Sequence, residues 1–163
     1  MNTMQQPGGT IYAASSRGIR RGSPTEAASY ASVSMSGRAT IMVVDDEPDV
    51  RLLLRLQLPP EGVQIVGEAG DGATAVQVCQ ATRPDAVVLD LLMPIMTGFE
   101  AIPAIREHAP DTRIVAYTAS AGQFVRDRMA ELDVALVLKS GDASDLVAAL
   151  RGEDPAEQPA SPA

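Results

Sequence analysis

Residues 40–58 read TIMVVDDEPDVRLLLRLQL, and this stretch decides the fold. Its first five residues are largely apolar and rich in β-branched side chains, which predicts a strand buried on both faces of a sheet. Three acidic residues follow directly, and then Pro48, which is favourable in the first turn of a helix. Beyond it, the apolar residues repeat with the spacing of one helix face: Val50, Leu53, Leu54 and Leu58.

The same strand-then-helix pattern recurs along the chain. Further apolar runs occupy residues 63–68, 86–89, 114–117 and 134–138, and each precedes a segment with helical spacing. Thr97 and Glu100 have the spacing of a capping box at the start of the third helix, and Pro103 is expected to kink that helix or to lie in its early turns. Five repeats predict a doubly wound (βα)5 sandwich of the α/β class, with a five-stranded parallel sheet in the flavodoxin-like order 2-1-3-4-5.

Composition divides the 163 residues into a core and two tails. Residues 1–38 are rich in Ser, Gly and Ala and carry a net charge of +3, whereas residues 153–163 are rich in Pro and Ala and carry −3. Both tails are predicted to be disordered because they lack apolar periodicity, and Met35 is a possible natural start. The folded domain is expected over residues 39–152, whose charges account for the whole net −8.

Several classes of protein are disfavoured by the same composition. A single cysteine, Cys79, cannot form an intramolecular disulfide, and no apolar run approaches the ~20 residues that span a bilayer. The net charge of −8 argues against direct binding of DNA. The sequence therefore predicts a cytoplasmic protein without membrane insertion. Cys79 is expected in the core, and His108 is expected to be exposed or to act as a favourable cation at a helix end.

Polar residues follow four of the predicted strands at the same edge of the sheet. Asp45 and Asp46 follow the first strand, Asp90 the third, Thr118 the fourth and Lys139 the fifth. Lys139 is the only lysine among thirteen basic residues, the other twelve being arginine. Because ligands of doubly wound sheets bind outside the carboxyl ends of the strands, this set predicts a functional site.

The residue types in this set suggest phosphoryl chemistry. Three carboxylates at one edge repel each other unless a counter-ion is present, and both Mg²⁺ and the ammonium of Lys139 can serve. A carboxylate beside such a cation can attack a phosphoryl group, giving an aspartyl phosphate. Lys139 and the hydroxyl of Thr118 would then contact the phosphoryl oxygens.

Residues 40–152 resemble the receiver domain of bacterial two-component response regulators. Within that family they resemble the stand-alone, chemotaxis-regulator type. Four stretches carry the resemblance: IMVVDDEP (41–48), VVLDLLMPIMTG (87–98), VAYTA (115–119) and VLK (137–139). The resemblance implies phosphorelay signal transduction, in which a sensor histidine kinase or a phosphotransfer protein phosphorylates Asp90 and a downstream protein target responds. It also implies a phosphoacceptor that promotes its own phosphorylation and dephosphorylation rather than an enzyme.

The resemblance further implies roles for individual residues. Mg²⁺ would be held by Asp46 directly, by Asp45 mostly through water, by Asp90 and by the backbone carbonyl of Leu92. Thr118 would move toward the phosphoryl group on activation, and Lys139 would bind its oxygens.

Two positions depart from the usual pattern of the family. Ser140 follows Lys139 where many receivers have proline, and Leu136 occupies the position of the usual switch aromatic. These departures keep open the alternative of a phosphorylation-independent interaction module, a pseudo-receiver. A phosphatase with an aspartyl nucleophile is disfavoured because Leu92 stands where such enzymes commonly carry a second acid. The cognate kinase, the output partner, the signal and the oligomeric state cannot be inferred from the sequence.

Overall fold

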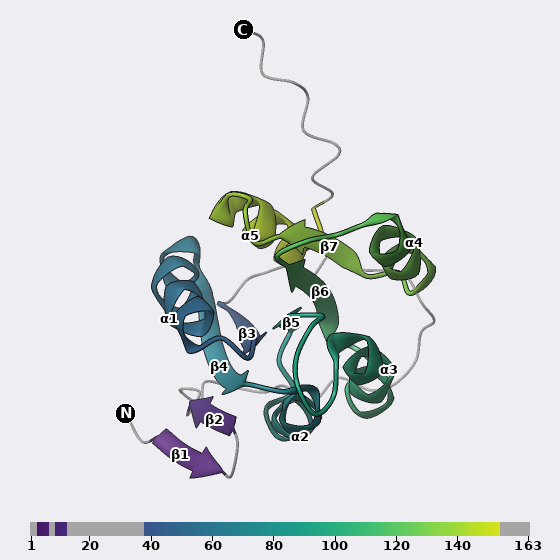
Figure 1. The fold of residues 1–163 in the computed structure, drawn as a ribbon. Helices are drawn as coiled ribbons and strands as arrows, with labels where there is room; N and C mark the ends of the chain where they lie inside the picture. The colour runs from purple at the N-terminus through teal and green to yellow at the C-terminus, as the bar shows by residue number, and fades with distance from the viewer. Residues whose placement is uncertain (1–2, 7–8, 13–37, 154–163) are drawn as a thin grey trace, which may run out of the picture.

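The computed structural model describes residues 3–6, 9–12 and 38–153, which build one sheet flanked by helices (Figure 1). The strands are β1 (Thr3–Gln6), β2 (Gly9–Tyr12), β3 (Ala39–Val44), β4 (Val63–Ala69), β5 (Ala86–Leu89), β6 (Arg113–Thr118) and β7 (Ala135–Leu138). The helices are α1 (Pro48–Gln57), a short 3₁₀ turn η1 (Pro59–Glu61), α2 (Gly72–Thr82), α3 (Gly98–His108), α4 (Gln123–Glu131) and α5 (Ala143–Arg151).

Five strands of the sheet are parallel and run in the order β4-β3-β5-β6-β7. Numbered along the predicted repeats, this order is 2-1-3-4-5, so the predicted doubly wound architecture is confirmed. In register, Val44 at the end of β3 lies opposite Leu89 at the end of β5. The residues that follow these two strands are therefore neighbours at one edge of the sheet.

The core has two halves, one on each face of the sheet. On one face, α2, α3 and α4 contribute buried residues such as Val78, Ile102 and Met129. On the other face, α1 and α5 contribute Leu54 and Leu146. In Figure 1 the sheet lies between these two groups of helices.

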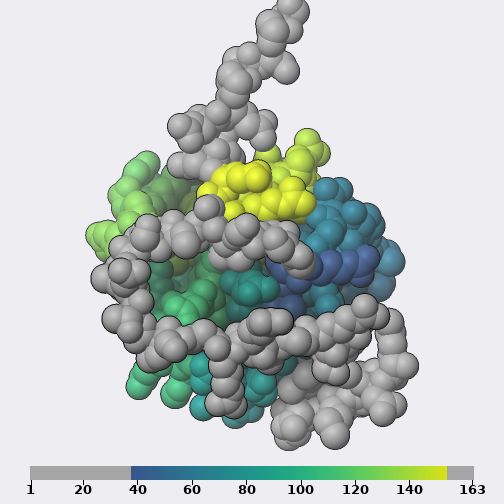
Figure 2. Space-filling model, turned by 180° about the vertical axis from the view of Figure 1, so that it is seen from behind, coloured from purple at the N-terminus to yellow at the C-terminus, as the bar shows by residue number. Residues whose placement is uncertain are grey.

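The end of α5 also lies beside the turn that follows α1. The guanidinium of Arg151 donates a hydrogen bond of 2.8 Å to the carbonyl of Glu61. Figure 2 shows the yellow residues of α5 next to the blue residues of β3 and α1 on the face seen from behind. This hydrogen bond joins α5 to the turn after α1, and the two helices α1 and α5 cover the same face of the sheet.

Within residues 1–38, predicted as a disordered tail, the described residues 3–6 and 9–12 form two short strands. β1 and β2 pair antiparallel with each other, and β2 pairs antiparallel with Gly67–Ala69 at the end of β4. The five parallel strands thus become part of a seven-stranded sheet. Composition averaged over 38 residues hides a local signal. Pro7 and Gly8, residues typical of turns, stand between two short segments, and the second segment contains Thr10, Ile11 and Tyr12, which favour strands. Residues 13–37, with Met35, and 154–163 lie outside the described residues.

The observed helix starts match those predicted from the sequence more closely than the observed buried helix faces do. Pro48 occupies the first turn of α1, and Thr97 and Glu100 form the predicted capping box of α3. The helix α3 continues through Pro103. Of the four residues predicted to share one helix face, Leu54 and Leu58 are buried and Val50 is partly buried, whereas Leu53 is 47% exposed. Cys79 is buried and His108 is exposed, as predicted.

Candidate functional site

The first two acids of the site are set by the ends of neighbouring strands. Asp45 follows β3 and Asp90 follows β5, and the amide of Asp90 donates a hydrogen bond of 2.9 Å to the carbonyl of Val44. Both side chains are buried, with exposed fractions of 1% for Asp45 and 5% for Asp90. Two carboxylates are thus held together in a place from which water is largely excluded.

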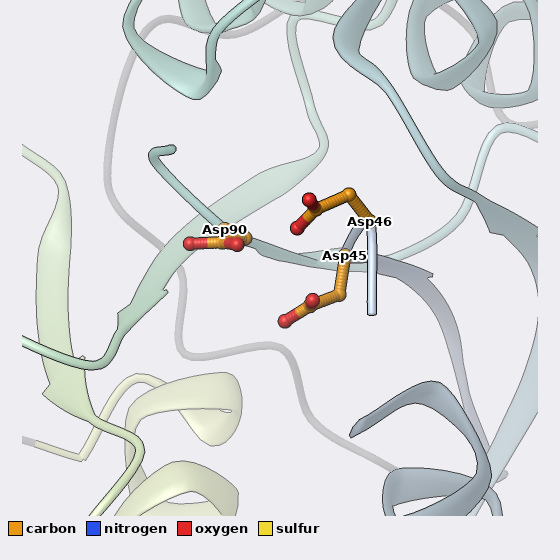
Figure 3. A group of neighbouring side chains, drawn as sticks. All are labelled: Asp45, Asp46 and Asp90. Atoms are coloured by element: carbon orange, nitrogen blue, oxygen red, sulfur yellow. The ribbon is translucent and has the colours of Figure 1, made fainter. Parts of the chain in front are cut away.

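A third carboxylate completes the cluster. Asp45, Asp46 and Asp90 each offer a carboxylate oxygen, and these oxygens all lie within 4.8 Å of one another. Figure 3 shows the side chains of Asp45 and Asp46 extending from successive residues toward the side on which Asp90 lies. Asp46 is exposed, in contrast to the other two. Clustered carboxylate oxygens with one side open to solvent fit Mg²⁺, which prefers oxygen ligands and retains several waters.

Lys139 is the cation that the structure brings to this cluster. Its ammonium nitrogen lies 2.6 Å from Oδ2 of Asp45, 3.3 Å from Oδ2 of Asp90 and 3.7 Å from Oε1 of Glu47. The amide of Lys139 donates to the carbonyl of Thr118 across the β6–β7 pair. Strand pairing therefore fixes the start of the side chain, and the acids fix its end.

The electrostatics of the cluster follow from its burial. Burial raises the pKa of Asp90, and the charge of Asp45 raises it further, whereas the charge of Lys139 lowers it in part. Burial alone would lower the pKa of Lys139, but the hydrogen bond and charge of Asp45, with the charge of Asp90, outweigh this effect and raise it. Lys139 thus stays protonated and partly compensates the two buried carboxylates.

Glu47 is a neighbour of the site that was not included among the predicted site residues. Its amide donates a hydrogen bond of 2.9 Å to Oδ1 of Asp45, and its carboxylate faces Lys139. The available signal was its place as the third consecutive acid after β3.

Thr118 is the last residue of β6, Leu92 lies in the loop after β5, and each has a local hydrogen bond. The hydroxyl of Thr118 is buried and donates to the carbonyl of Ser120 at 3.2 Å. The amide of Leu92 donates to Oδ1 of Asp90 at 3.3 Å, while its side chain is 69% exposed. The roles predicted for the Thr118 hydroxyl and the Leu92 carbonyl stay predictions.

The two unusual positions of the sequence lie near Lys139. Leu136 is half-buried in β7 and packs against the half of the core on the side of α3 and α4. Ser140 lies in the turn between β7 and α5. Tyr117 lies on the other side of β6, buried with the residues of α1 and α5, and burial raises the pKa of its hydroxyl. Leu136 and Tyr117 thus belong to opposite halves of the core.

The loop after Asp90 is held by two glycines. The amide of Gly98 donates to the carbonyl of Leu91 at 3.1 Å, and the amide of Gly72 donates to the carbonyl of Met96 at 3.0 Å. A Cβ at Gly98 would overlap the carbonyl of Asp90, and a Cβ at Gly72 would come within 2.6 Å of the carbonyl oxygen of Met96. Both ends of the loop therefore require the absence of a side chain at these glycines.

No helix among the described residues is both long and apolar enough to cross a bilayer.

A known family and several known proteins are similar to this chain. Residues 41–151 match the response regulator receiver domain family. The chain is 41% identical over 80 residues to protein-glutamate methylesterase/protein-glutamine glutaminase 3 of Hahella chejuensis, which covers 49% of this chain and 23% of that protein. It is 38% identical over 93 residues to the probable transcriptional regulatory protein TcrX of Mycobacterium tuberculosis, which covers 57% of this chain and 38% of that protein.

Solved structures with this fold are also similar. A two-component response regulator of the LuxR family from Aurantimonas sp. SI85-9A1 superposes with a TM-score of 0.66 and 35% identity, covering 72% of this chain and 88% of that chain. The match with the two curated relatives spans less than half of the length of either.

Proposed function

The chain belongs to the response regulator receiver domain family, and we propose that it works in phosphorelay signal transduction by accepting a phosphoryl group on the carboxylate of Asp90. One observation carries the choice of residue. The Asp90 carboxylate is buried beside Asp45 and lies 3.3 Å from the ammonium of Lys139. A buried carboxylate with a like charge beside it is costly, which favours a chemical role for Asp90.

The proposed donor of the phosphoryl group is a phosphohistidine of a sensor histidine kinase or phosphotransfer protein. A carboxylate oxygen of Asp90 attacks the phosphorus, and a new oxygen–phosphorus bond forms as the phosphorus–nitrogen bond of the donor breaks. The electron pair of the broken bond leaves on the histidine nitrogen, which can then take up a proton. Asp90 must be ionised to act in this way, and the charge of Lys139 favours that form.

Lys139 has a second task once the phosphoryl group is in place. Its ammonium lies between the Asp45 and Asp90 carboxylates, so a small movement brings it to an oxygen of the phosphoryl group. The hydroxyl of Thr118 would exchange the Ser120 carbonyl for another phosphoryl oxygen. That exchange would change the loop after β6, and we propose that partner binding responds to this change.

Magnesium is proposed as the metal of the site. Asp45, Asp46, Asp90 and the backbone carbonyl of Leu92 would hold it. When bound, Mg²⁺ supplies positive charge that offsets the charge of the phosphoryl oxygens.

The finer type of the protein is also a proposal. We propose a phosphoacceptor rather than an enzyme, a cytoplasmic location and a chemotaxis-regulator-like mode in which the receiver acts by binding a downstream protein. The receiver fold of the described residues supports the phosphoacceptor role. The mass of the protein isolated from its natural source tests whether a further domain accompanies the receiver.

Phosphorylation is tested with acetyl phosphate and Mg²⁺ on the full chain, followed by intact mass spectrometry. We expect the wild type to gain the mass of one phosphoryl group and Asp90→Asn to gain none. Asp127→Asn on the exposed face of α4 is the matched control and should gain it as the wild type does. A wild type that gains nothing, or an Asp90→Asn variant that gains as much, would overturn the proposal in favour of a phosphorylation-independent module.

A further inference from the structure

Arg51 on α1 contacts the turn that carries the first two acids. Its Nη1 donates a hydrogen bond of 2.6 Å to the backbone carbonyl of Asp45. Its own amide donates at 3.2 Å to the carbonyl of Glu47, so the side chain starts from the first turn of the helix and reaches back. The guanidinium therefore binds the backbone of the acidic turn and does not pair with one of its carboxylates.

Asp45 is held at each of its polar atoms. Its amide donates to the carbonyl of Ala69 at 3.1 Å, and its carboxylate accepts from the amide of Glu47 and faces Lys139. The carbonyl is held by Arg51. That carbonyl belongs to the peptide group that joins Asp45 to Asp46.

Asp46 depends on this peptide group for its direction. In the part of the chain that the structure describes, no hydrogen bond or ion pair holds the Asp46 carboxylate, which is exposed. Its place within 4.8 Å of the other two carboxylates is therefore set by the backbone. A side chain that fixes the Asp45–Asp46 peptide also fixes where the Asp46 carboxylate points.

The guanidinium also reaches the loop after β4. A Cβ built on Gly70 would lie 3.6 Å from Nη1 of Arg51 and 4.0 Å from the carbonyl oxygen of Asp45. The guanidinium thus lies between the loop after β3 and the loop after β4. A larger side chain at position 70 would compete with it for space.

We propose that Arg51 is a positioning residue of the phosphoacceptor site, which holds the Asp45–Asp46 turn in the geometry that a divalent cation requires. This inference rests on the proposed function for its biological meaning, but metal binding tests it independently. Mg²⁺ demands nearly ideal octahedral geometry, so a displaced carboxylate weakens its binding.

Charge and positioning predict opposite results at Arg51. A cation near three carboxylates opposes the binding of a second cation, so its loss would tighten Mg²⁺ binding if charge dominated. If Arg51 positions the turn, its loss weakens Mg²⁺ binding, by roughly tenfold, as for other outer-shell partners of metal ligands.

The experiment measures Mg²⁺ binding by calorimetry on the full, unphosphorylated chain, with the thermal midpoint recorded without metal. Arg51→Met should weaken Mg²⁺ binding roughly tenfold, and Arg51→Lys, which keeps a cationic donor, should recover part of the loss. The matched control is Arg55→Met, one turn along α1, where the guanidinium pairs with Glu68 at 3.5 Å. It should bind Mg²⁺ as the wild type does. Equal or tighter binding by a folded Arg51→Met would overturn the proposal.

A second pair of variants keeps the test valid if Arg51→Met does not fold. Gly70→Leu leaves Arg51 intact but fills its space, and it should weaken Mg²⁺ binding, whereas Gly70→Ala makes an ordinary contact and should not. Equal affinity for these two variants would also overturn the proposal. Failure of Asp90 to take up a phosphoryl group would overturn the proposed function. The Mg²⁺ affinities of these variants would still decide whether Arg51 positions the Asp45–Asp46 turn.

Discussion

The ammonium nitrogen of Lys139 lies closer to Asp45, at 2.6 Å, than to Asp90, at 3.3 Å. The lysine and a bound metal would therefore compete for the same buried carboxylate. Lys139→Met should tighten Mg²⁺ binding at least several-fold, because a positive charge this close costs about 1 kcal/mol or more in a partly solvated site. Calorimetry on the full chain measures the change, and weaker binding by the folded variant would contradict it.

Lys139→Arg keeps the charge but changes its shape. The planar fork of arginine needs more width than an ammonium, so it cannot take the place of Lys139 between two carboxylates. We expect phosphorylation-dependent changes in hydrogen exchange over residues 113–139 to be reduced more than Mg²⁺ affinity. A variant with the full exchange response would show that the single lysine has no special role.

Gly98→Ala should displace the phosphoacceptor. The added methyl group would overlap the carbonyl of Asp90 and crowd Cα of Leu91, which are backbone atoms and cannot rotate away. We expect a loss of about 1–3 kcal/mol in the free energy of unfolding and slower phosphorylation by acetyl phosphate. Gly122→Ala is the control, since nothing lies within 4 Å of its Cβ. Urea denaturation of both variants makes the comparison.

Ile95 adopts a backbone conformation that is unfavourable for its side chain. Its φ is +70°, in the left-handed region that β-branched residues avoid, and its side chain is 85% exposed. Ile95→Gly should therefore stabilise the protein by about 1 kcal/mol, because little burial is lost and the strain is relieved. Leu92→Gly in the same loop has no positive φ to relieve and should not stabilise. Urea denaturation would contradict the expectation if the two variants changed alike.

The sequence predicted most of the fold because the signals that decide it are local. The strands that precede Asp45 and Asp90 are visible as apolar runs followed by acids, and parallel pairing brings these strand ends together. The capping box of Thr97 and Glu100 was predictable for the same reason, since three residues separate its partners.

What could not be predicted depends on side-chain directions and on distant pairing. The reach of Arg51 to the Asp45 carbonyl depends on a rotamer, and the exposure of Leu53 depends on how α1 tilts on the sheet. The pairing of Gly9 with Ala69 joins residues sixty positions apart, and short strands gain their stability from such pairing rather than from propensity.

Cys79 gives a pH dependence with a definite sign. Burial raises the pKa of its thiol above the ordinary value of 9.0, and contacts with Thr112 and Arg83 offset this only in part. The folded chain therefore holds the proton more strongly than the unfolded chain, so the contribution is complete below the unfolded pKa and is lost as pH rises toward the folded one. The free energy of unfolding should fall between pH 8 and pH 10 more in the wild type than in Cys79→Ala. Equal falls in urea denaturation would contradict this.

The N-terminal strands predict a local pattern of hydrogen exchange. β2 covers only Gly67–Ala69, the last three residues of β4. Deleting residues 1–12 should therefore speed exchange over residues 67–69, while β7 at the far edge of the sheet stays unchanged and serves as the control. Unaltered exchange over residues 67–69 would show that β2 does not pair there in solution.

The two glycines that hold the loop after Asp90 also separate the residues that can vary from those that cannot. Gly98 holds the start of the loop by donating to the carbonyl of Leu91, and Gly72 holds its end by donating to the carbonyl of Met96. Leu92 and Ile95, which lie within the loop, face solvent. Side chains at positions 92 and 95 can therefore be exchanged without moving the acid that precedes them. A library randomised at these two positions could therefore be selected for variants that accept a different phosphodonor, while the residues that carry out the phosphoryl transfer stay the same.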